Sequence, residues 1–345
     1  MRRLASSAEP GRGSRLLPEP ERGPISGRLF RSAMDGILVS AVSQNHFPQL
    51  RGLVQSGQRY LPDSWRIIVY DLLGDLRSSH TTEIASWCGV EYRRFDPRTT
   101  NATWDPRYLT LSVWKPPIIK DSLMSLGPGG IVLYADAAVR LHGPLSSSLI
   151  AAVQEHGFLG RQTASPVSSY THPQMAIELG NQRHAQVSLT DYATAPMVCG
   201  CISLWARKPF VVDRLLDPWM SCTTRPACIL PPGADGQDNR AGLSTKCRPG
   251  LEGHCHRGDQ SALSIILYDA FEARKTGSPL YLRNSSSGAE TWRMNKAVLH
   301  GTLFTTERFS TKSVAPMRRA KGTHDERKVS RRNAATTRSC DVQYR

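Results

Sequence analysis

The chain has 345 residues, of which 39% are hydrophobic, and a formal net charge of +15. It is long enough to bury one large α/β domain or two smaller ones. No run approaches the roughly 20 apolar residues that a membrane-spanning helix requires, and residues 1–34 lack a continuous apolar signal core. The sequence therefore predicts a globular protein in which no membrane anchor is visible.

The positive charge is concentrated at the two ends. Residues 1–34 hold seven arginines against three glutamates, and residues 311–345 hold ten lysines and arginines against three acids, which leaves +4 for the segment between them. Basic tails without apolar periodicity are typical of solvated, disordered segments. We predict a disordered basic leader or stem (1–34), a catalytic domain (35–310) and a disordered basic tail (311–345), and we expect no nucleic-acid partner.

Apolar runs alternate with amphipathic segments in the first half of the chain. Strands are predicted at 36–42, 65–70, 90–95 and 131–134, and helices between them at 46–60, 79–88 and 111–126. Pro116 and Pro117 are expected in the first turn of the third helix or at a kink. This alternation predicts an α/β fold with a mainly parallel, twisted sheet flanked by helices.

The second half is predicted to mix both element types. Helices are expected at 146–155, 208–219 and 260–271, and strands at 157–160 and 197–204. Asp259 is predicted to occupy the N-cap of the last helix. Residues 221–258 are rich in Cys, Pro and Gly, which predicts a long loop.

Cysteine usage indicates an oxidising compartment. Five of the eight cysteines fall between residues 199 and 247, and Cys255 follows closely. Such clustering suits disulfides, for which Cys222–Cys228 and Cys247–Cys255 are plausible local pairs, although the spacing does not fix the connectivity. Glycosylation sequons begin at Asn101 and Asn284. These features favour the secretory lumen.

A single carboxylate, Asp136, follows the apolar strand predicted at 131–134. Transferring a sugar from a nucleotide diphosphate requires stabilising the departing diphosphate, usually with Mn²⁺ or Mg²⁺ held by carboxylates. The surroundings of Asp136 resemble the Asp-x-Asp segment of GT-A glycosyltransferases, with Tyr134 in the place of the first acid. A strand-end Asp that only caps the following turn is the alternative.

A second polar cluster opens the last predicted helix. A helix N-terminus presents free N–H groups and a positive dipole end to anions. The segment Asp259-Gln260-Ser261-Ala262-Leu263 resembles the Asp-Gln segment found late in several GT-A families, where it faces the donor and acceptor sugars. A plain N-cap without a ligand is the alternative.

Several further segments, in the same order, resemble an animal family of poorly characterised GT-A-like glycosyltransferases. They are the Trp-Lys-Pro helix start at 114–119, the segment 133–141, the Cys-containing loop at 219–234 and the His-Arg-x-Asp-Gln-Ser-Ala-Leu segment within 256–267. The resemblance covers roughly residues 36–272. It implies a nucleotide-diphospho-sugar transferase fold, metal-dependent sugar transfer and a Golgi setting. Gly258, where a bulky residue is expected, and the insertion-like residues 235–253 depart from the pattern.

The resemblance and the strand ends together predict a set of site residues. Asp259 and Gln260 are expected to orient the donor or acceptor, and Asp136 to hold the metal. His300 corresponds to a late histidine that completes the metal shell in some related enzymes, although a lone histidine is more often structural. The expected donor-binding residues are Lys115 and Arg140 at the diphosphate, and Ser40, Ser43 and Asp71 at the nucleoside.

The leading interpretation is a metal-assisted, hexosyltransferase-like enzyme that moves a sugar from a nucleotide-sugar donor to a glycan or glycoprotein acceptor. A catalytically silent GT-A-like binding protein of the secretory pathway is the alternative, favoured by Tyr134 and Gly258. A third interpretation is a zinc-bearing, polyanion-binding protein with Cys247, His254, Cys255 and His256 as ligands. The cysteine spacings, however, differ from those of the usual short zinc knuckles.

Overall fold

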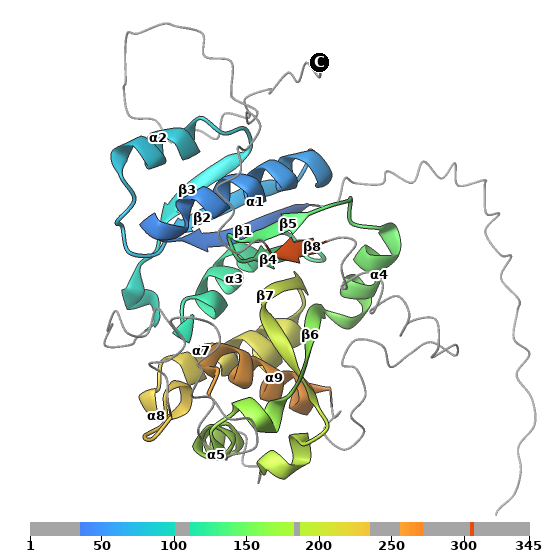
Figure 1. Ribbon diagram of the computed structural model, residues 1–345. Coiled ribbons are helices and arrows are strands. Elements are labelled where there is room, and N and C mark those ends of the chain that lie inside the picture. Colours follow the sequence, from blue (N-terminus) through green and yellow to red (C-terminus); the bar gives the residue numbers. More distant parts are fainter. Residues whose placement is uncertain (1–34, 101–110, 183–186, 235–255, 272–303, 307–345) are drawn as a thin grey trace, which may run out of the picture. The chain divides into compact units, whose positions relative to one another are not determined.

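Six strands form the main sheet in the computed structural model, which describes residues 35–100, 111–182, 187–234, 256–271 and 304–306 (Figure 1). Their order across the sheet is β3-β2-β1-β4-β7-β6. β1 pairs in parallel with β2 and β4, and β2 with β3, whereas β7 runs antiparallel to both β4 and β6. The predicted α/β class with a mainly parallel sheet is confirmed. The strands are β1 (Gly36–Val42), β2 (Arg66–Asp71), β3 (Val90–Arg94), β4 (Ile131–Ala135), β6 (Phe158–Pro166) and β7 (Pro196–Ala206).

The central strands are predominantly apolar because helices cover both faces of the sheet. Every residue of β1 and β4 is buried, as expected for parallel strands enclosed on both sides. The register places Val42 beside Asp71 and Val39 beside Tyr134. The carboxyl ends of β1, β2 and β4 therefore reach the same edge of the sheet.

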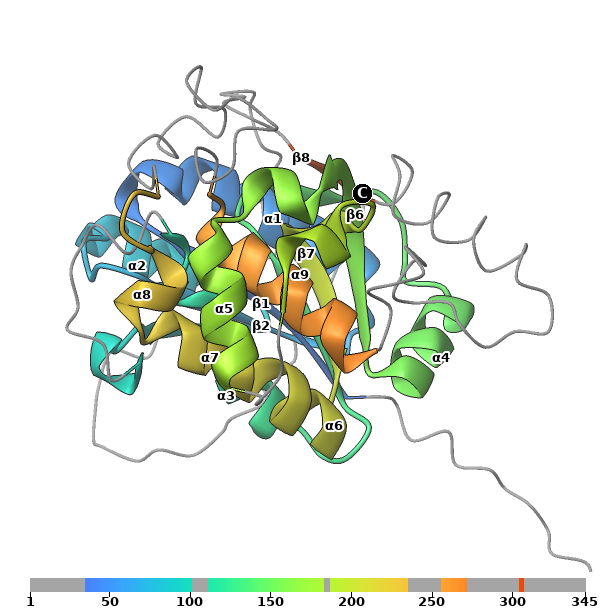
Figure 2. The same cartoon turned by 90° about the horizontal axis from the view of Figure 1, so that it is seen from below.

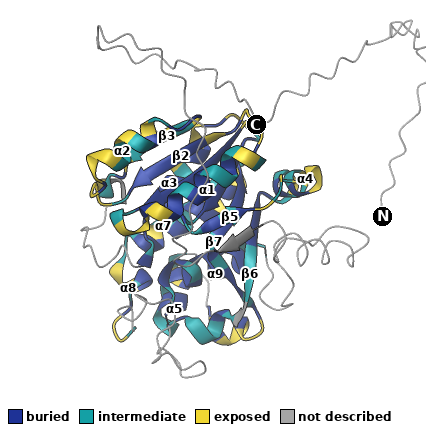
Figure 3. Cartoon of the chain, turned by 45° about the horizontal axis from the view of Figure 1, so that its top comes forward, coloured by how far each residue is buried: buried dark blue, intermediate teal, exposed yellow. Residues whose placement is uncertain are grey.

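Helices of the first half pack on these strands. α1 (Phe47–Tyr60) packs against β1 and the short strand β5 (Val139–Leu141), and α3 (Lys115–Met124) against β1 and β4. α2 (Ser78–Ala85) and α4 (Ser147–His156) lie farther out and include exposed residues (Figure 3). Pro116 and Pro117 fall in the first turn of α3, as predicted.

A second group of helices surrounds α9 (Gly258–Ala270), which lies along β7 (Figure 2). α9 is buried on nearly all sides, which explains why its apolar residues are not confined to one face. Its neighbours are α5 (Pro173–Gln182), α7 (Asp217–Thr223) and α8 (Pro226–Ile229). Trp205 of β7 stacks on Trp219 of α7 with ring centroids 6.0 Å apart, which ties this group to the sheet.

Short elements complete the described chain. β8 (Phe304–Thr306) pairs antiparallel with β5. Within the described ranges, no helix has both the length and the apolar character needed to cross a bilayer. The short helical turns are η1 (Gln44–His46), η2 (Pro97–Thr100), η4 (Val167–Tyr170), η5 (Leu189–Tyr192), α6 (Pro209–Val211) and the π-helical η6 (Val212–Leu216).

The second half departs from the predictions in its details. The strand predicted at 157–160 extends to Pro166 because it pairs with the long β7. The helix predicted at 208–219 consists of α6, η6 and α7 and continues to Thr223, so the predicted loop 221–258 begins inside a helix and also contains α8. The Cys222–Cys228 disulfide is confirmed. Both predicted tails, the insertion-like segment, both sequons, Cys247, His254, Cys255 and His300 lie outside the described residues.

Candidate functional site

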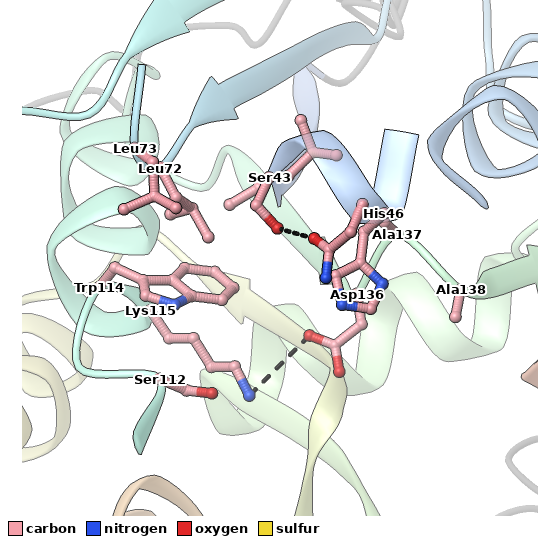
Figure 4. A pocket seen from close by; sticks show the side chains of 13 residues that line it. Ser43, His46, Leu72, Leu73, Ser112, Trp114, Lys115, Asp136, Ala137 and Ala138 are labelled. Atoms are coloured by element: carbon pink, nitrogen blue, oxygen red, sulfur yellow. Dashed lines mark hydrogen bonds and ion pairs between the residues drawn. The ribbon is translucent and has the colours of Figure 1, made fainter. Parts of the chain in front are cut away.

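A pocket of about 400 Å³ lies at the carboxyl ends of β1, β2 and β4 (Figure 4). The chain builds the sheet outward from β1 towards β3 and then returns to add β4 on the other side of β1. In open α/β sheets this reversal of strand order leaves a crevice outside the carboxyl ends, where ligands bind. The lining residues come from the loops after the three strands and from the start of α3, and include Ser43, Asn45, His46, Leu72, Leu73, Ser112, Trp114, Lys115 and Asp136.

Lys115 is the centre of the charged part of this pocket. It is the first residue of α3, is only 5% exposed and lines the pocket. Its Nζ lies 2.6 Å from Oδ2 of Asp259 and 3.8 Å from Oδ1 of Asp136. Burial alone would lower the pKa of Lys115, but the two carboxylates outweigh it and raise that pKa above its ordinary value. The side chain is therefore a stable ammonium ion.

Asp136 is the carboxylate that faces the pocket. Its side chain is 37% exposed, and its backbone N–H donates to the carbonyl of Cys201 at 2.9 Å. Burial raises the pKa of Asp136, against the attraction of Lys115 and the hydrogen bond that the Tyr134 hydroxyl donates to Oδ1. Burial, together with the charge of Asp136, raises the pKa of Tyr134 well above its ordinary value. Tyr134 is therefore a neutral donor to Asp136 at the position of the first acid of the Asp-x-Asp pattern.

Asp259 does not cap α9 as predicted. The N-cap is Arg257, without a side-chain cap, and Asp259 lies inside the first turn with its carboxylate turned to Lys115. It is 8% exposed. The prediction was wrong because an ammonium ion 2.6 Å away is a stronger partner for a buried carboxylate than a backbone N–H.

Two glycines bring the backbone close to this ion pair. A Cβ on Gly200 would lie 2.6 Å from Oδ2 of Asp259 and 2.9 Å from Nζ of Lys115. A Cβ on Gly258 would lie 2.7 Å from the carbonyl oxygen of Ile229. Gly258, which departs from the family pattern, thus permits the close packing of α9 on α8.

Two cysteines flank Gly200 and form a disulfide with each other. Cys199 and Cys201 are joined within β7, and the Cys201 N–H donates to Sγ of Cys199. Because β7 is antiparallel to β4, its first half lies at the same sheet edge as the carboxyl end of β4. The disulfide therefore fixes the segment that covers the Lys115–Asp259 pair.

The structure brings some of the predicted residues together and places others elsewhere. Ser43, Lys115 and Asp136 line the pocket, Asp259 contacts Lys115, and the Gln260 side chain reaches the backbone at Gly200. The remaining residues point elsewhere. Asp71 accepts hydrogen bonds from Tyr92 and from the backbone of Gly74, Arg140 donates to the carbonyls of Ala137 and Val139, and Ser40 is fully buried in β1.

Several lining residues were not among the predicted ones. Asn45 and His46 belong to η1, directly after β1, so a polar cluster behind the first predicted strand was the available signal. Ser112 has a φ of 57°, in the left-handed region that a non-glycine residue adopts only when its surroundings require it. Its carbonyl accepts the N–H of Lys115 at 3.1 Å, and nothing in the sequence indicates this conformation.

The described residues do not fit a divalent cation. None of their His, Cys, Asp and Glu side chains form a group of three or more that could hold a metal ion. Of the two carboxylates near the pocket, Asp259 is bound to Lys115, and Asp136 is contacted by Lys115 and Tyr134. His300, the other predicted metal ligand, lies outside the described residues, so the expectation of Mn²⁺ or Mg²⁺ stays a prediction.

His256 does not fit a zinc ligand. Its Nδ1 accepts the backbone N–H of His172 at 3.1 Å, and its Nε2 lies 3.0 Å from the carbonyl oxygen of Ile229. Both ring nitrogens are thus engaged with the main chain, and the ring is 2% exposed. Burial lowers the pKa of His256 to about 4, so the imidazole is neutral and structural.

The chain matches no protein-family model and no curated protein. Solved structures similar to it include the apo form of the bifunctional glycosyltransferase WbbM, with a TM-score of 0.36 and 12% identity over 55% of this chain and 35% of that one. An active-site mutant of LgtC has a TM-score of 0.35 and 12% identity over 54% of this chain and 59% of that one. The chain thus covers less than two thirds of either protein, and likenesses of this size carry no weight for its function.

Proposed function

We propose that the chain is a glycosyltransferase that moves a sugar from a nucleotide-diphosphate donor to a hydroxyl group of a glycan or glycoprotein. The observation that carries the proposal is a buried ammonium ion, Lys115, held between two carboxylates in a pocket at the carboxyl ends of parallel strands. Such a cation stabilises negative charge that develops on a leaving diphosphate, and it does so strongly where water is excluded. We also propose that the protein acts in the Golgi and that its acceptor is a glycan or a glycoprotein.

In the proposed reaction, each of the three charged residues Lys115, Asp136 and Asp259 has a role. The acceptor oxygen forms a bond to the anomeric carbon, the bond from that carbon to the diphosphate oxygen breaks, and its electron pair leaves with the diphosphate. Lys115 faces the diphosphate. The acceptor's proton passes to Asp136, the carboxylate that lines the pocket, whose raised pKa suits a general base. Asp259 fixes the ammonium group of Lys115 from the far side.

The test is release of nucleoside diphosphate from UDP- and GDP-sugars by the full chain prepared under oxidising conditions. Release above the buffer rate is expected with one of these donors, and Asp136→Asn should reduce it at least a hundredfold, the lower end for loss of a general base. An Asp121→Asn variant, on the exposed side of α3, is the control that should keep full activity. Equal rates in Asp136→Asn and the unmodified chain would contradict the proposed role.

A silent binding protein is the second candidate, because Tyr134 replaces one of the two acids of the Asp-x-Asp pattern and its hydroxyl is bonded to the remaining acid. This candidate predicts that UDP or GDP raises the melting temperature of the protein while no nucleoside diphosphate is released from any sugar donor. Turnover that Asp136→Asn abolishes would exclude it.

A further inference from the structure

The chemistry of the charged cluster is that of an internal cation rather than of a metal site. Its charged members are Asp136, Asp259 and Lys115, and the ammonium lies 2.6 Å and 3.8 Å from oxygens of the two acids. The position of the first acid in the Asp-x-Asp pattern carries Tyr134, a neutral donor. One of the two carboxylate charges is thus already met by a cation that the chain itself supplies.

A divalent ion would conflict with this arrangement. An ion bound by Oδ1 of Asp136 at about 2.1 Å would lie within about 6 Å of the Lys115 ammonium and would be repelled by it. The other side of the pair is closed, because the backbone at Gly200 leaves no room for a methyl group beside Asp259 and Lys115. A hydrated ion is larger than a methyl group and cannot enter there.

Lys115 is also unlike the other lysine on the same helix. Lys120 pairs with Asp217 at the surface, where the two side chains are 31% and 46% exposed. The side chain of Lys115 is 6% exposed, contacts two acids and lies 5.7 Å and 5.8 Å from the ring centroids of Trp114 and Tyr134. Lysine is almost never buried unless it is paired, and here the paired group also lines the pocket.

From these observations, and resting on the proposed function, we infer that the Lys115 ammonium takes the place of the divalent cation and that the pocket binds a nucleoside diphosphate without metal. Lys115 contacts the diphosphate, Asp259 keeps the ammonium in place, and Asp136 remains available to the acceptor. The site therefore discriminates a diphosphate from a monophosphate by the charge of one lysine.

The test is calorimetric titration of the full chain with UDP, GDP and UMP, in EDTA and again in Mn²⁺. We expect UDP or GDP to bind in EDTA with a dissociation constant within threefold of that in Mn²⁺, and UMP to bind at least tenfold more weakly than UDP. Binding that requires Mn²⁺ would overturn the inference and leave the proposed function standing. A folded chain that binds no nucleotide in either buffer would overturn both.

Three variants of α3 sharpen the test. Lys115→Met should weaken the binding of the diphosphate at least tenfold in EDTA and remove the preference for UDP over UMP, whereas Lys120→Met should change neither. If Lys115→Met is too unstable to titrate, Lys115→Arg is measured in its place. It keeps the positive charge and should retain the preference for UDP over UMP. An unchanged preference in a folded Lys115→Met protein would contradict the inference.

Discussion

Lys115 connects three elements that are far apart in the sequence: α3, which it begins, the end of β4 at Asp136, and α9 at Asp259. A buried charge is stable only while its partners remain, because removing one partner leaves the other charge without compensation in a poorly solvated place. The ion pair that places an ammonium group in the pocket therefore also stabilises the fold.

Lys115→Met is expected to lower the free energy of unfolding by about 3–5 kcal/mol, the usual cost of breaking a buried ion pair. Lys120→Met, which removes a surface pair on the same helix, should cost at most about 1 kcal/mol. Urea denaturation followed by circular dichroism measures both values. Equal losses in the two variants would show that Asp259 and Asp136 do not need the ammonium.

The raised pKa of Asp136 has a visible consequence for the rate. The side chain acts as a base only when it is ionised, so activity should fall as the pH drops through its pKa, and the raised value places that fall above the ordinary range of an aspartate near 4. The rate of nucleoside diphosphate release, measured between pH 4 and 8, checks this. The acid limb should be absent from the residual activity of Asp136→Asn.

His256 predicts acid sensitivity of the fold. Its pKa is about 4 in the folded protein and near 6.5 when unfolded, so below pH 6.5 the unfolded chain binds the extra proton first. The contribution of His256 to the free energy of unfolding should therefore be constant above pH 6.5 and fall by about 3 kcal/mol between pH 6.5 and 4. Denaturation at several pH values measures the slope. His256→Gln should flatten it, whereas replacing the exposed His142 with Gln should not.

At the scale of elements, the strands and helices of the first half of the chain could be predicted, because their local apolar patterns determine which element forms. The β-branched run 36–42 and the periodic segment 46–60 form β1 and α1 almost as expected. The site could be predicted only in part. The acids at the end of β4 and at the start of α9 could be recognised in the sequence. The pairing of Asp259 with Lys115 could not, because it depends on the tertiary packing of α9, which no local pattern reports.

The close contact between α9 and α8 is a testable property of Gly258. Gly258→Ala should lower the free energy of unfolding by about 1–3 kcal/mol, because the new methyl group would meet the Ile229 carbonyl at 2.7 Å and the backbone would have to shift. Gly127→Ala is the matched control, since a Cβ there meets nothing within 4 Å. Thermal or urea denaturation of both variants gives the comparison. A cost no larger than that of Gly127→Ala would contradict it.

At the scale of the whole molecule, the direction of β7 decides where the cysteines act. The strand runs back along β4, so Cys199 and Cys201 lie at the edge that carries the pocket, whereas Cys222 and Cys228 join α7 to α8. Sequence spacing made Cys222–Cys228 a plausible pair but gave no such indication for Cys199–Cys201. We therefore expect the Cys199–Cys201 disulfide to affect nucleotide binding and the Cys222–Cys228 disulfide to affect stability alone.

Replacing each pair with serine separates these roles. The Cys199→Ser, Cys201→Ser double variant should bind the nucleotide at least threefold more weakly than the unmodified chain does. The reason is that Gly200 is no longer fixed against Lys115 and Asp259. The Cys222→Ser, Cys228→Ser double variant should leave the affinity unchanged and cost about 2 kcal/mol of stability, as expected for a short closed loop. Calorimetric titration and urea denaturation of both variants are the measurements. Identical profiles would contradict this division.

The 144 residues that separate Lys115 from Asp259 also set an order of events during synthesis. At about 5–20 residues per second, the ribosome adds the second partner on the order of ten seconds after the first. During that interval the nascent chain can assemble β1 to β4, and of its two described partners Lys115 has Asp136 alone. The pocket is therefore completed late in translation, when α9 emerges and neutralises a lysine that the earlier strands have already enclosed.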